Sequence, residues 1–277
     1  MMKNTITMLL LSFIMMSCAA QKKPKIKGDK NVIEINNIIK EAFNKIVIDD
    51  GLEVKFIPSQ TSFYRLETDA NIAVGMNFKV VDSVLQIYSE NRIVSSKKLN
   101  IEVSAGNIEA ITLKNDASIE SKRVLESKTM ILTAGGSSKF DLDIDSKSVG
   151  IVLSGNAGGR LKIKGDSTYI NMSDRTDLKG DLVAKEVSIS LADNAELKLD
   201  GTSDTAKFNV SGGSGLKLDD LKVDSASLNA SGNTDVYINV AKELDVYAKD
   251  KSSIFIYGEP TMNVSGLVDD AKIEKRG

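Results

Sequence analysis

Short runs of alternating hydrophobic and polar residues make up most of the chain. From about residue 99 onward these runs are separated by Gly, Asn, Asp and Ser, and no long segment has the spacing of an amphipathic helix. Side chains in a strand alternate between two faces, so this pattern places one face in a core and leaves the other polar. The pattern predicts an all-β fold made of many short strands.

A pair of such runs recurs with a period of about 20 residues. In each copy an apolar-x-apolar run is followed by a five-residue link and a second such run, and the third residue of the first run falls at 113, 134, 155, 172, 191, 210, 230 and 248. A repeat built only from strands is typical of a single-stranded β-helix, or β-solenoid, whose neighbouring coils hydrogen-bond about 4.8 Å apart. We therefore expect regular coils over 99–277.

The five-residue links have the composition of turns. The links at 173–177, 192–196, 211–215 and 231–235 consist mainly of Ser, Gly, Asn, Asp and Thr. Gly, Asn and Asp accept a positive φ or hydrogen-bond to their own backbone, so these links are expected to bend every coil at the same corner. The chain contains only three prolines, which suits stacked strands because each must donate its N–H groups to the next coil.

Residues 32–98 fit the repeat less closely. Segments 45–57 and 78–88 have the pattern of strands and turns, and we expect a β-rich N-terminal section that belongs to the same single domain, 32–277. A short helix in this section would cap the edge of the solenoid, which otherwise could pair with other chains. Helical spacing is found at Ile35, Ile38, Ile39, Ala42, Phe43 and Ile46.

The first residues have the proportions of a secretory signal. A positive start at 1–3 is followed by eleven apolar residues at 6–16 and by a junction of small residues. Eleven residues are too few to cross a bilayer as a helix, which takes about 20. We predict a lipoprotein signal peptide at 1–17.

The only cysteine, Cys18, follows this apolar run directly. Residues 15–18, Met-Met-Ser-Cys, resemble the lipobox of bacterial lipoproteins, so we expect Cys18 to be acylated and to hold the chain on a membrane. The alternative is ordinary cleavage near Ala20, which would release a soluble periplasmic protein. Residues 18–31 are polar and rich in lysine, and we interpret them as a tether between the membrane and the domain.

Several segments together resemble a known family. These segments are 43–48, 52–57, 69–72, 85–87, 99–103, 108–111 and the repeated turns rich in Ser and Gly. They are similar to the head GIN domain family of auto-transporter adhesins, which is common among lipoproteins of Bacteroidota and has no firmly assigned activity. The resemblance covers roughly residues 40–260. It implies a single-stranded β-helix, adhesion, and lipid anchoring in a Gram-negative envelope, at the outer membrane on its periplasmic or surface side.

The composition narrows the possible chemistry. Lys and Arg number 36 against 38 Asp and Glu, so there is no basic field of the kind that gathers phosphates, and nucleic acid is not expected as a partner. The absence of histidine removes the Ser-His-Asp triad, the Cys-His dyad and histidine metal sites, and a single cysteine cannot form a disulfide within the chain. We expect no cofactor, no metal site and no enzymatic activity. A polysaccharide lyase or hydrolase is the distant alternative, because adjacent acids such as Asp219 and Asp220 point to opposite faces of a strand.

One outward column of side chains supplies candidate ligand contacts. It lies between the inward positions of the second run and is predicted to contain Glu120, Asp141, Lys162, Lys179, Lys198, Lys217, Tyr237 and Phe255. Four lysines in a row would suit an anionic glycan. The next outward column is predicted to contain Lys164, Asp181, Asp200 and Asp219, so a self-neutralising charge ladder is the preferred interpretation.

Outward aromatic residues gather in the last coils. Tyr237 and Phe255 end the lysine column, and Tyr257 and Tyr247 are expected to lie close to them. Such rings could stack on a sugar, or they could form a structural ladder between coils. A further outward column, to which we assign structural hydrogen bonding, is predicted to contain Thr133, Ser154, Asn171, Ser190, Asn209 and Asn229.

Together these features predict a lipid-anchored protein of the cell envelope that works as a non-catalytic binding or adhesion module. Its expected partners are the membrane, through acylated Cys18, and a glycan or another envelope protein. The alternative is a lipid-binding or scaffold protein, and a concave apolar surface would favour lipid binding.

Overall fold

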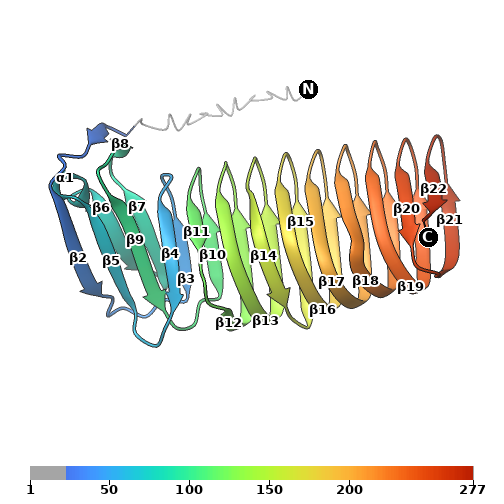
Figure 1. The fold of residues 1–277 in the computed structure, drawn as a ribbon, viewed down its shortest axis with the longest axis horizontal. Helices are drawn as coiled ribbons and strands as arrows, with labels where there is room; N and C mark the ends of the chain where they lie inside the picture. Colours follow the sequence, from blue (N-terminus) through green and yellow to red (C-terminus); the bar gives the residue numbers. More distant parts are fainter. Residues whose placement is uncertain (1–22, 277) are drawn as a thin grey trace, which may run out of the picture.

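The computed structural model describes residues 23–276 and is a β-solenoid. Strands make up 67% of it and helix 2%, and about nine turns follow one another with a spacing of about 19 residues. Figure 1 shows a rod in which the chain advances from one end to the other. The predicted all-β solenoid is therefore confirmed. The predicted signal peptide and Cys18 lie outside the described residues.

The N-terminal section contains nine strands and one short helix. These are β1 (Lys25–Lys27), β2 (Val32–Ile38), β3 (Lys45–Ile48), β4 (Glu53–Pro58), β5 (Phe63–Asp69), α1 (Ala70–Ala73), β6 (Met76–Val81), β7 (Val84–Ser89), β8 (Arg92–Ser95) and β9 (Leu99–Ala105).

The regular coils follow from β10 to β22. Their bounds are β10 (Ala110–Leu113), β11 (Ser118–Glu120), β12 (Leu125–Ala134), β13 (Lys139–Leu153), β14 (Gly158–Lys164), β15 (Ser167–Met172), β16 (Asp177–Leu191), β17 (Glu196–Val210), β18 (Gly215–Ala230), β19 (Asp235–Ala248), β20 (Ser253–Tyr257), β21 (Thr261–Leu267) and β22 (Lys272–Lys275).

Each regular coil has two arms joined by a tight corner. The outgoing arm follows a four-residue corner, and the return arm leads into the next one; in β17, for example, the chain leaves corner 192–195 and returns to corner 211–214. Strands of successive coils pair in parallel on both arms. The inward side chains of both arms form one hydrophobic core, in which the Phe208 side chain is completely buried. The outward side chains of the two arms consequently lie on opposite faces of the rod.

The stacking register differs from the predicted one in one coil. The residue that pairs with Ala134 and Met172 is Leu153, not Gly155, so both neighbouring coils are 19 residues away. Gly155 is instead a corner residue with φ +72°. A shift of two residues preserves which side chains face inward, so alternation alone does not distinguish the two registers.

The second residue of each corner adopts a positive φ. Asn, Gly or Asp occupies this position in all nine corners between β10 and β22, as the turn composition predicted. The next residue donates its N–H to the carbonyl of the positive-φ residue one coil earlier, as Asn194 does to Asp174 at 2.8 Å. Where the residue is Asp, its carboxylate caps the preceding corner: Asp174 accepts from the N–H of Gly155 at 2.8 Å, and Asp193 from that of Asp174 at 3.2 Å.

The N-terminal section extends each arm first with a parallel strand and then with antiparallel strands. The outgoing sheet continues from β4 through β9 and β5 to β2, and the return sheet from β3 through β7 to β6. The helix indicated by the spacing at 35–46 does not form there, because residues 32–38 belong to β2. The short helix of this section is the single turn α1, at Ala70–Ala73. A few scattered isoleucines fit either period, and pairing with β5 favours the extended form.

Residues 23–31 belong partly to the folded domain. β1 pairs with β8, so the fold begins before the expected boundary at 32. The buried carboxylate of Asp69 accepts the N–H of Lys30 at 2.5 Å and that of Lys97 at 2.7 Å. Burial by itself raises the pKa of Asp69, but these backbone donors, together with Lys98, bring it below its usual value. The carboxylate thus fixes the entering chain to the end of the rod.

The last coil differs from the others because no further coil of residues 23–276 stacks on it. Met262, Val264 and Leu267 of β21 occupy inward positions, yet they are 37%, 44% and 49% exposed, whereas Leu244, which pairs with Met262, is 1% exposed. Within residues 23–276, β21 pairs only with β19, and β22 pairs only with β20. This end of the rod is shown in red in Figure 1. We refer to β21, β22 and residue 268 as the open end.

Candidate functional site

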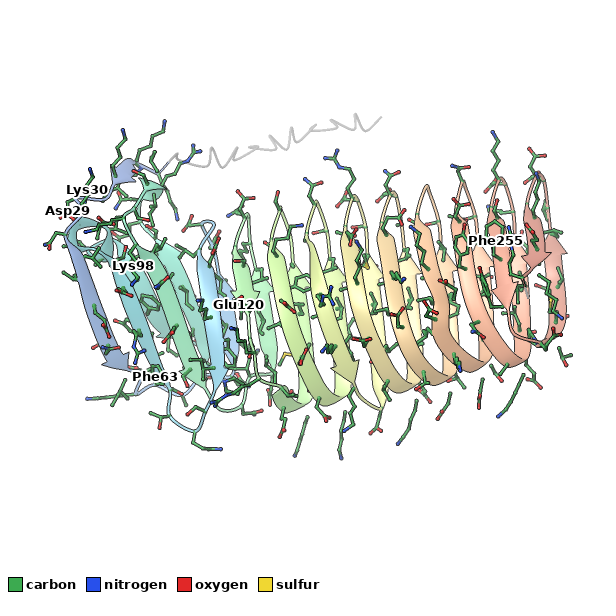
Figure 2. The ribbon with its side chains drawn as sticks, in the orientation of Figure 1. Asp29, Lys30, Phe63, Lys98, Glu120 and Phe255 are labelled. Carbon is green, nitrogen blue, oxygen red and sulfur yellow. The ribbon has the colours of Figure 1, made fainter. Side chains whose placement is uncertain are left out.

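The outgoing face carries the charged column that the sequence predicted, with one exchange. Successive members pair with one another, and Arg160 occupies the place expected for Lys162. Figure 2 labels Glu120 and Phe255, near the two ends of the regular part of this column. Its members are Glu120, Asp141, Arg160, Lys179, Lys198, Lys217, Tyr237, Phe255 and Glu274.

Lys162 lies in the neighbouring outward column. There it pairs with Asp143 in one coil and with Asp181 in the next. Lys164, which is expected in this column, lies farther along the strand. Its ammonium donates to the carboxylate of Asp145 at 2.9 Å, and this hydrogen bond raises the pKa of Lys164. Both changes follow from the two-residue register shift. Arg160 could have been found by aligning Gly155 with the corner aspartates.

The cations of the outgoing face are partly neutralised by neighbouring carboxylates. The Nζ atoms of Lys179, Lys198 and Lys217 lie 3.7, 4.0 and 3.2 Å from carboxylates of Asp177, Asp220 and Glu196, respectively. All six side chains are about half exposed, so each pair contributes little to stability. Over residues 23–276, no carboxylate lies within 4.0 Å of the Arg160 guanidinium or the Lys162 ammonium. These distances fit the self-neutralising ladder, in which Arg160 and Lys162 are the less compensated charges.

Arg160 borders a shallow depression on this face. The depression holds about 470 Å³, and Lys139, Asp141, Asp177 and Lys179 also line it. Gly159, which pairs with Phe140 in one coil and Leu178 in the next, also lines the depression. Three cations therefore surround a hollow that also has two carboxylates at its edge, which suits a ligand with a limited negative charge.

The aromatic residues of the outgoing face form a ladder. The rings of Tyr237 and Phe255 stack with centroids 4.6 Å apart and planes inclined by 19°. The guanidinium of Arg276 lies 5.0 Å from the centroid of Phe255, and Tyr257 follows Asn239 in the next column. Phe255 therefore already has a stacking partner on the Tyr237 side and a cation above its ring. The Tyr237–Phe255 contact fits the structural ladder better than an open sugar platform.

Tyr247 is separated from the other three aromatic residues. It lies on the return arm of β19, so its side chain is on the opposite face of the rod from Tyr237. The single aromatic cluster expected from the sequence is therefore wrong. Alternation along a strand distinguishes inward from outward, but it does not show that β19 turns from one arm to the other between these tyrosines.

Tyr247 stands at one end of a groove on the return face. The groove holds about 380 Å³, and its floor follows four successive coils. The outward column along this floor contains Val152 where Ser154 was expected, again because of the register shift. Its further members are Asn171, Ser190, Asn209, Asn229 and Tyr247.

The groove offers hydrogen-bonding groups and one exposed ring. Asn229 donates from Nδ2 to Oδ1 of Asn209 at 3.3 Å, and the outer amides of Asn171 and Asn229 are exposed. Tyr247 is 38% exposed and lies over Gly266, where a Cβ would be only 2.7 Å from the ring. The groove combines amide donors and acceptors with an aromatic face, the combination that binds neutral polyhydroxylated molecules.

A mostly apolar depression lies at the bend between the arms. It is lined by Val124, Ile144, Ile163 and Val183 and holds about 260 Å³, slightly below the range of about 300–1,000 Å³ typical of ligand pockets. It is surrounded by charged side chains, which are those of Asp143, Asp145, Lys162, Lys164 and Asp181. A concave apolar surface is the feature that we expect to favour lipid binding, and this depression is apolar at its floor but small and bordered by charges.

Neither a metal-binding cluster nor a membrane-spanning helix is found in the described part of the chain. Residues 23–276 contain no group of three or more Asp, Glu, His or Cys side chains arranged to hold a metal ion. Within that part, no helix has the length and apolar character needed to cross a bilayer.

The sequence matches a family model over most of its length. The model is described as "Putative auto-transporter adhesin, head GIN domain", and it matches residues 42–165 and 156–260. The chain belongs to this family. Membership of a head GIN adhesin family indicates a protein of the cell surface or envelope with a binding or adhesion role. No curated protein matches the chain.

Solved structures with the same fold come from Parabacteroides. A "putative adhesin" of Parabacteroides distasonis has a TM-score of 0.67 at 16% identity, and a "putative lipid binding protein" of the same organism has 0.62 at 18%; each match covers 91% of this chain and 100% of the other. A "putative adhesin" of Parabacteroides merdae has 0.60 at 15%, covering 92% and 100%. At these identities the similarity establishes the fold alone. The family and these three structures are described as adhesins or as a lipid-binding protein.

Proposed function

We propose that this head GIN protein is a non-catalytic adhesion module of the cell envelope that binds glycans along the return-face groove. The observation that carries this proposal is the exposed Tyr247 ring at the end of a groove floored by Asn171, Ser190, Asn209 and Asn229.

The spacing of the groove suits a polymer. Parallel coils repeat about every 4.8 Å along the rod, so the groove presents a similar polar side chain at each step. Each asparagine amide has two N–H donors and an acceptor oxygen, which match the hydroxyl groups of a sugar in either direction. A linear glycan lying along the rod would contact several coils, and a terminal ring would stack on Tyr247.

The outgoing face is a second candidate surface, for acidic glycans. The less compensated charges of Arg160 and Lys162 and the adjacent hollow favour it. Against it, Lys179, Lys198 and Lys217 already have carboxylate neighbours, and Phe255 is stacked. The return-face groove has neither difficulty, and we therefore prefer it.

A lipid-binding role has one specific support, the description of one structural relative as a lipid-binding protein. The small volume of the apolar depression at Val124 and Val183, and the charges around it, speak against a lipid site there. A lyase or hydrolase would need convergent acids. Asp219 and Asp220 lie at an irregularity in the pairing of β17 with β18, where Asp220 contacts Lys198 at 4.0 Å, so one of the two carboxylates already has a cation beside it.

The proposal includes membrane anchoring through acylated Cys18, at the outer membrane. Cys18 precedes the first described residue, Lys23, whose ammonium contacts Asp50 at the N-terminal end of the rod. An anchored rod would therefore be attached at that end. Radiolabelled palmitate incorporation in the intact chain, compared with Cys18→Ser, tests this part: equal labelling of the two chains would refute it.

The groove is tested by a glycan array and an envelope-polysaccharide pull-down. The chain from Gln21 contains every described residue and is compared with Tyr247→Ala and Asn209→Ala. Tyr257→Ala is the matched control, because it removes a tyrosine from the opposite face. We expect binding that falls at least about tenfold in Tyr247→Ala and stays unchanged in the control, since ring stacking contributes on the order of 1 kcal/mol or more.

Other outcomes decide between the surfaces. Loss of binding in the Tyr237/Phe255/Tyr257 triple alanine variant, with Tyr247→Ala unaffected, would assign the glycan to the outgoing face and refute the groove. No binding by the unaltered chain to any glycan would refute the proposed function and leave a scaffold or lipid-handling role.

A further inference from the structure

Both ends of the rod carry exposed apolar side chains. At the N-terminal end, Leu66 and Ile72 are buried, but Ile38 of β2 is 69% exposed and Val81 of β6 is 48% exposed. At the open end, Met262, Val264, Leu267 and the adjoining Val268 are 37–49% exposed. Exposed apolar side chains beside unpaired strand edges are a surface that proteins ordinarily cover or protect.

The strand edges of the open end are as incomplete as its core. β21 and β22 each have a partner on one side only within residues 23–276, so the N–H and C=O groups of their other edges face solvent. Any occupant that supplies two strands would continue both sheets of the solenoid and cover the apolar side chains between them. A second copy of this chain has such a pair of edges at its own open end.

We propose that the open end binds the open end of a second copy, related by a two-fold axis, to form an end-to-end dimer. A two-fold axis across the rod makes each edge strand meet its own counterpart in the antiparallel direction. Head-to-tail stacking onto β2 and β6, which also have one partner each within residues 23–276, is the competing arrangement, and it would give filaments in place of a closed dimer.

The charges of β22 are complementary to themselves in this arrangement. Antiparallel pairing of two β22 strands centred on Ile273 places Lys272 of each copy opposite Glu274 of the other. Both side chains are outward and exposed, and Ile273, which is inward, meets its own counterpart. In the single chain the Glu274 side chain is 55% exposed, and its carboxylate contacts Arg276 of the same copy at 3.2 Å.

The sequence of β21 is compatible with the same pairing. Centred on Val264, it sets this inward valine opposite its own counterpart and Asn263 opposite Ser265, which are both polar. The apolar side chains that are exposed in the single chain then face one another across the junction. A two-fold contact of this kind closes on itself, so association stops at the dimer.

Sedimentation velocity of the chain from Gln21 measures the association. Val264→Lys places a charge at the centre of the junction, and Val183→Lys is its matched control, since Val183 is 51% exposed on the side of the rod. We expect a dimer whose dissociation constant rises at least about tenfold in Val264→Lys and is unchanged in the control. Unfolding midpoints of both variants verify that they fold.

Charge exchange tests the register without touching the core. Lys272→Glu and Glu274→Lys each set like charges opposite one another twice in the dimer, so each is expected to weaken association about tenfold. The double variant, with both substitutions, restores opposite charges and is expected to return to within about twofold of the original dissociation constant. Failure of the double variant to recover would refute this pairing.

Spin labels verify which ends meet. The chain from Gln21 has no cysteine, so Val268→Cys marks the open end and Val74→Cys the N-terminal end. The dimer is expected to give a short distance between labels at 268 and none between labels at 74. A chain that stays monomeric at all concentrations, or that forms filaments, would overturn the proposal and assign the open end to a different occupant.

Discussion

Asp193 gives a direct test of how the corners stabilise the stack. It has a φ of +63°, and its carboxylate accepts the N–H of Asp174 in the preceding coil at 3.2 Å. Asp193→Ala removes this hydrogen bond, at a cost of about 1 kcal/mol. It also places alanine in the left-handed region, which costs a further ~1 kcal/mol because alanine has no local hydrogen bond to support it. We expect the free energy of unfolding to fall by about 2 kcal/mol.

Two companion variants separate the contributions. Asp193→Gly loses the hydrogen bond but has no strain at positive φ, so it is expected to be about 1 kcal/mol more stable than Asp193→Ala. Asn194→Ala changes the next residue of the same corner, which is exposed and has no positive φ, and is expected to stay within about 0.5 kcal/mol of the original chain.

Urea denaturation, followed by far-ultraviolet circular dichroism at constant pH, measures all three variants. The slopes of the transitions must agree for the midpoints to be compared as stabilities. Equal stability of the alanine and glycine variants would show that backbone strain is absent at this corner. A loss in Asn194→Ala as large as in Asp193→Ala would refute the assignment of the effect to the positive-φ position.

Three further predictions concern the core and the N-terminal end. Phe208→Ala opens a cavity at a completely buried position and should reduce the free energy of unfolding by about 3–5 kcal/mol in urea. Gly180→Ala should cost about 1–3 kcal/mol by the same measurement, because its Cβ would be 1.7 Å from the carbonyl oxygen of Leu161; an unchanged midpoint would contradict this packing. The depressed pKa of Asp69 stabilises the fold fully above the usual pKa of about 4 and progressively less as the pH falls through the lower folded value. Asp69→Asn should therefore be less stable than the original chain at pH 7 and lose less stability between pH 5 and pH 2, and parallel pH profiles would refute this role.

The repeat was predictable because its inward positions are chemically uniform. Leu191 and Val210, for example, were placed correctly from alternation alone, and the structure pairs them directly. The slip at Gly155 shows the limit of alternation, since a displacement by two residues leaves the inward and outward pattern intact. The corner was the better reference, because only a few residue types accept a positive φ there.

The candidate site was harder to predict because it depends on which arm carries each residue. Tyr237 and Tyr247 both follow the outward pattern, but β19 turns between them and places them on opposite faces. A bend inside a continuous strand is not marked in the sequence by a cluster of turn residues. The inward positions of the open end, in contrast, can be recognised from sequence once the register is known, because Met262, Val264 and Leu267 continue the inward columns of the preceding coils.

The direction of the hydrogen bonds between coils determines how the rod responds to tension. Bonds such as those from Asn194 to Asp174 connect successive coils, so they lie along the axis of the rod. A force that pulls on the two ends therefore loads one coil at a time, starting at an end of the rod, where the strands have a neighbour on one side only. Each coil of about 19 residues releases roughly 65 Å of chain when it detaches, because an extended residue spans about 3.4 Å. A molecule attached at one end and loaded at the other would yield in small steps and lengthen considerably before the remaining coils separate.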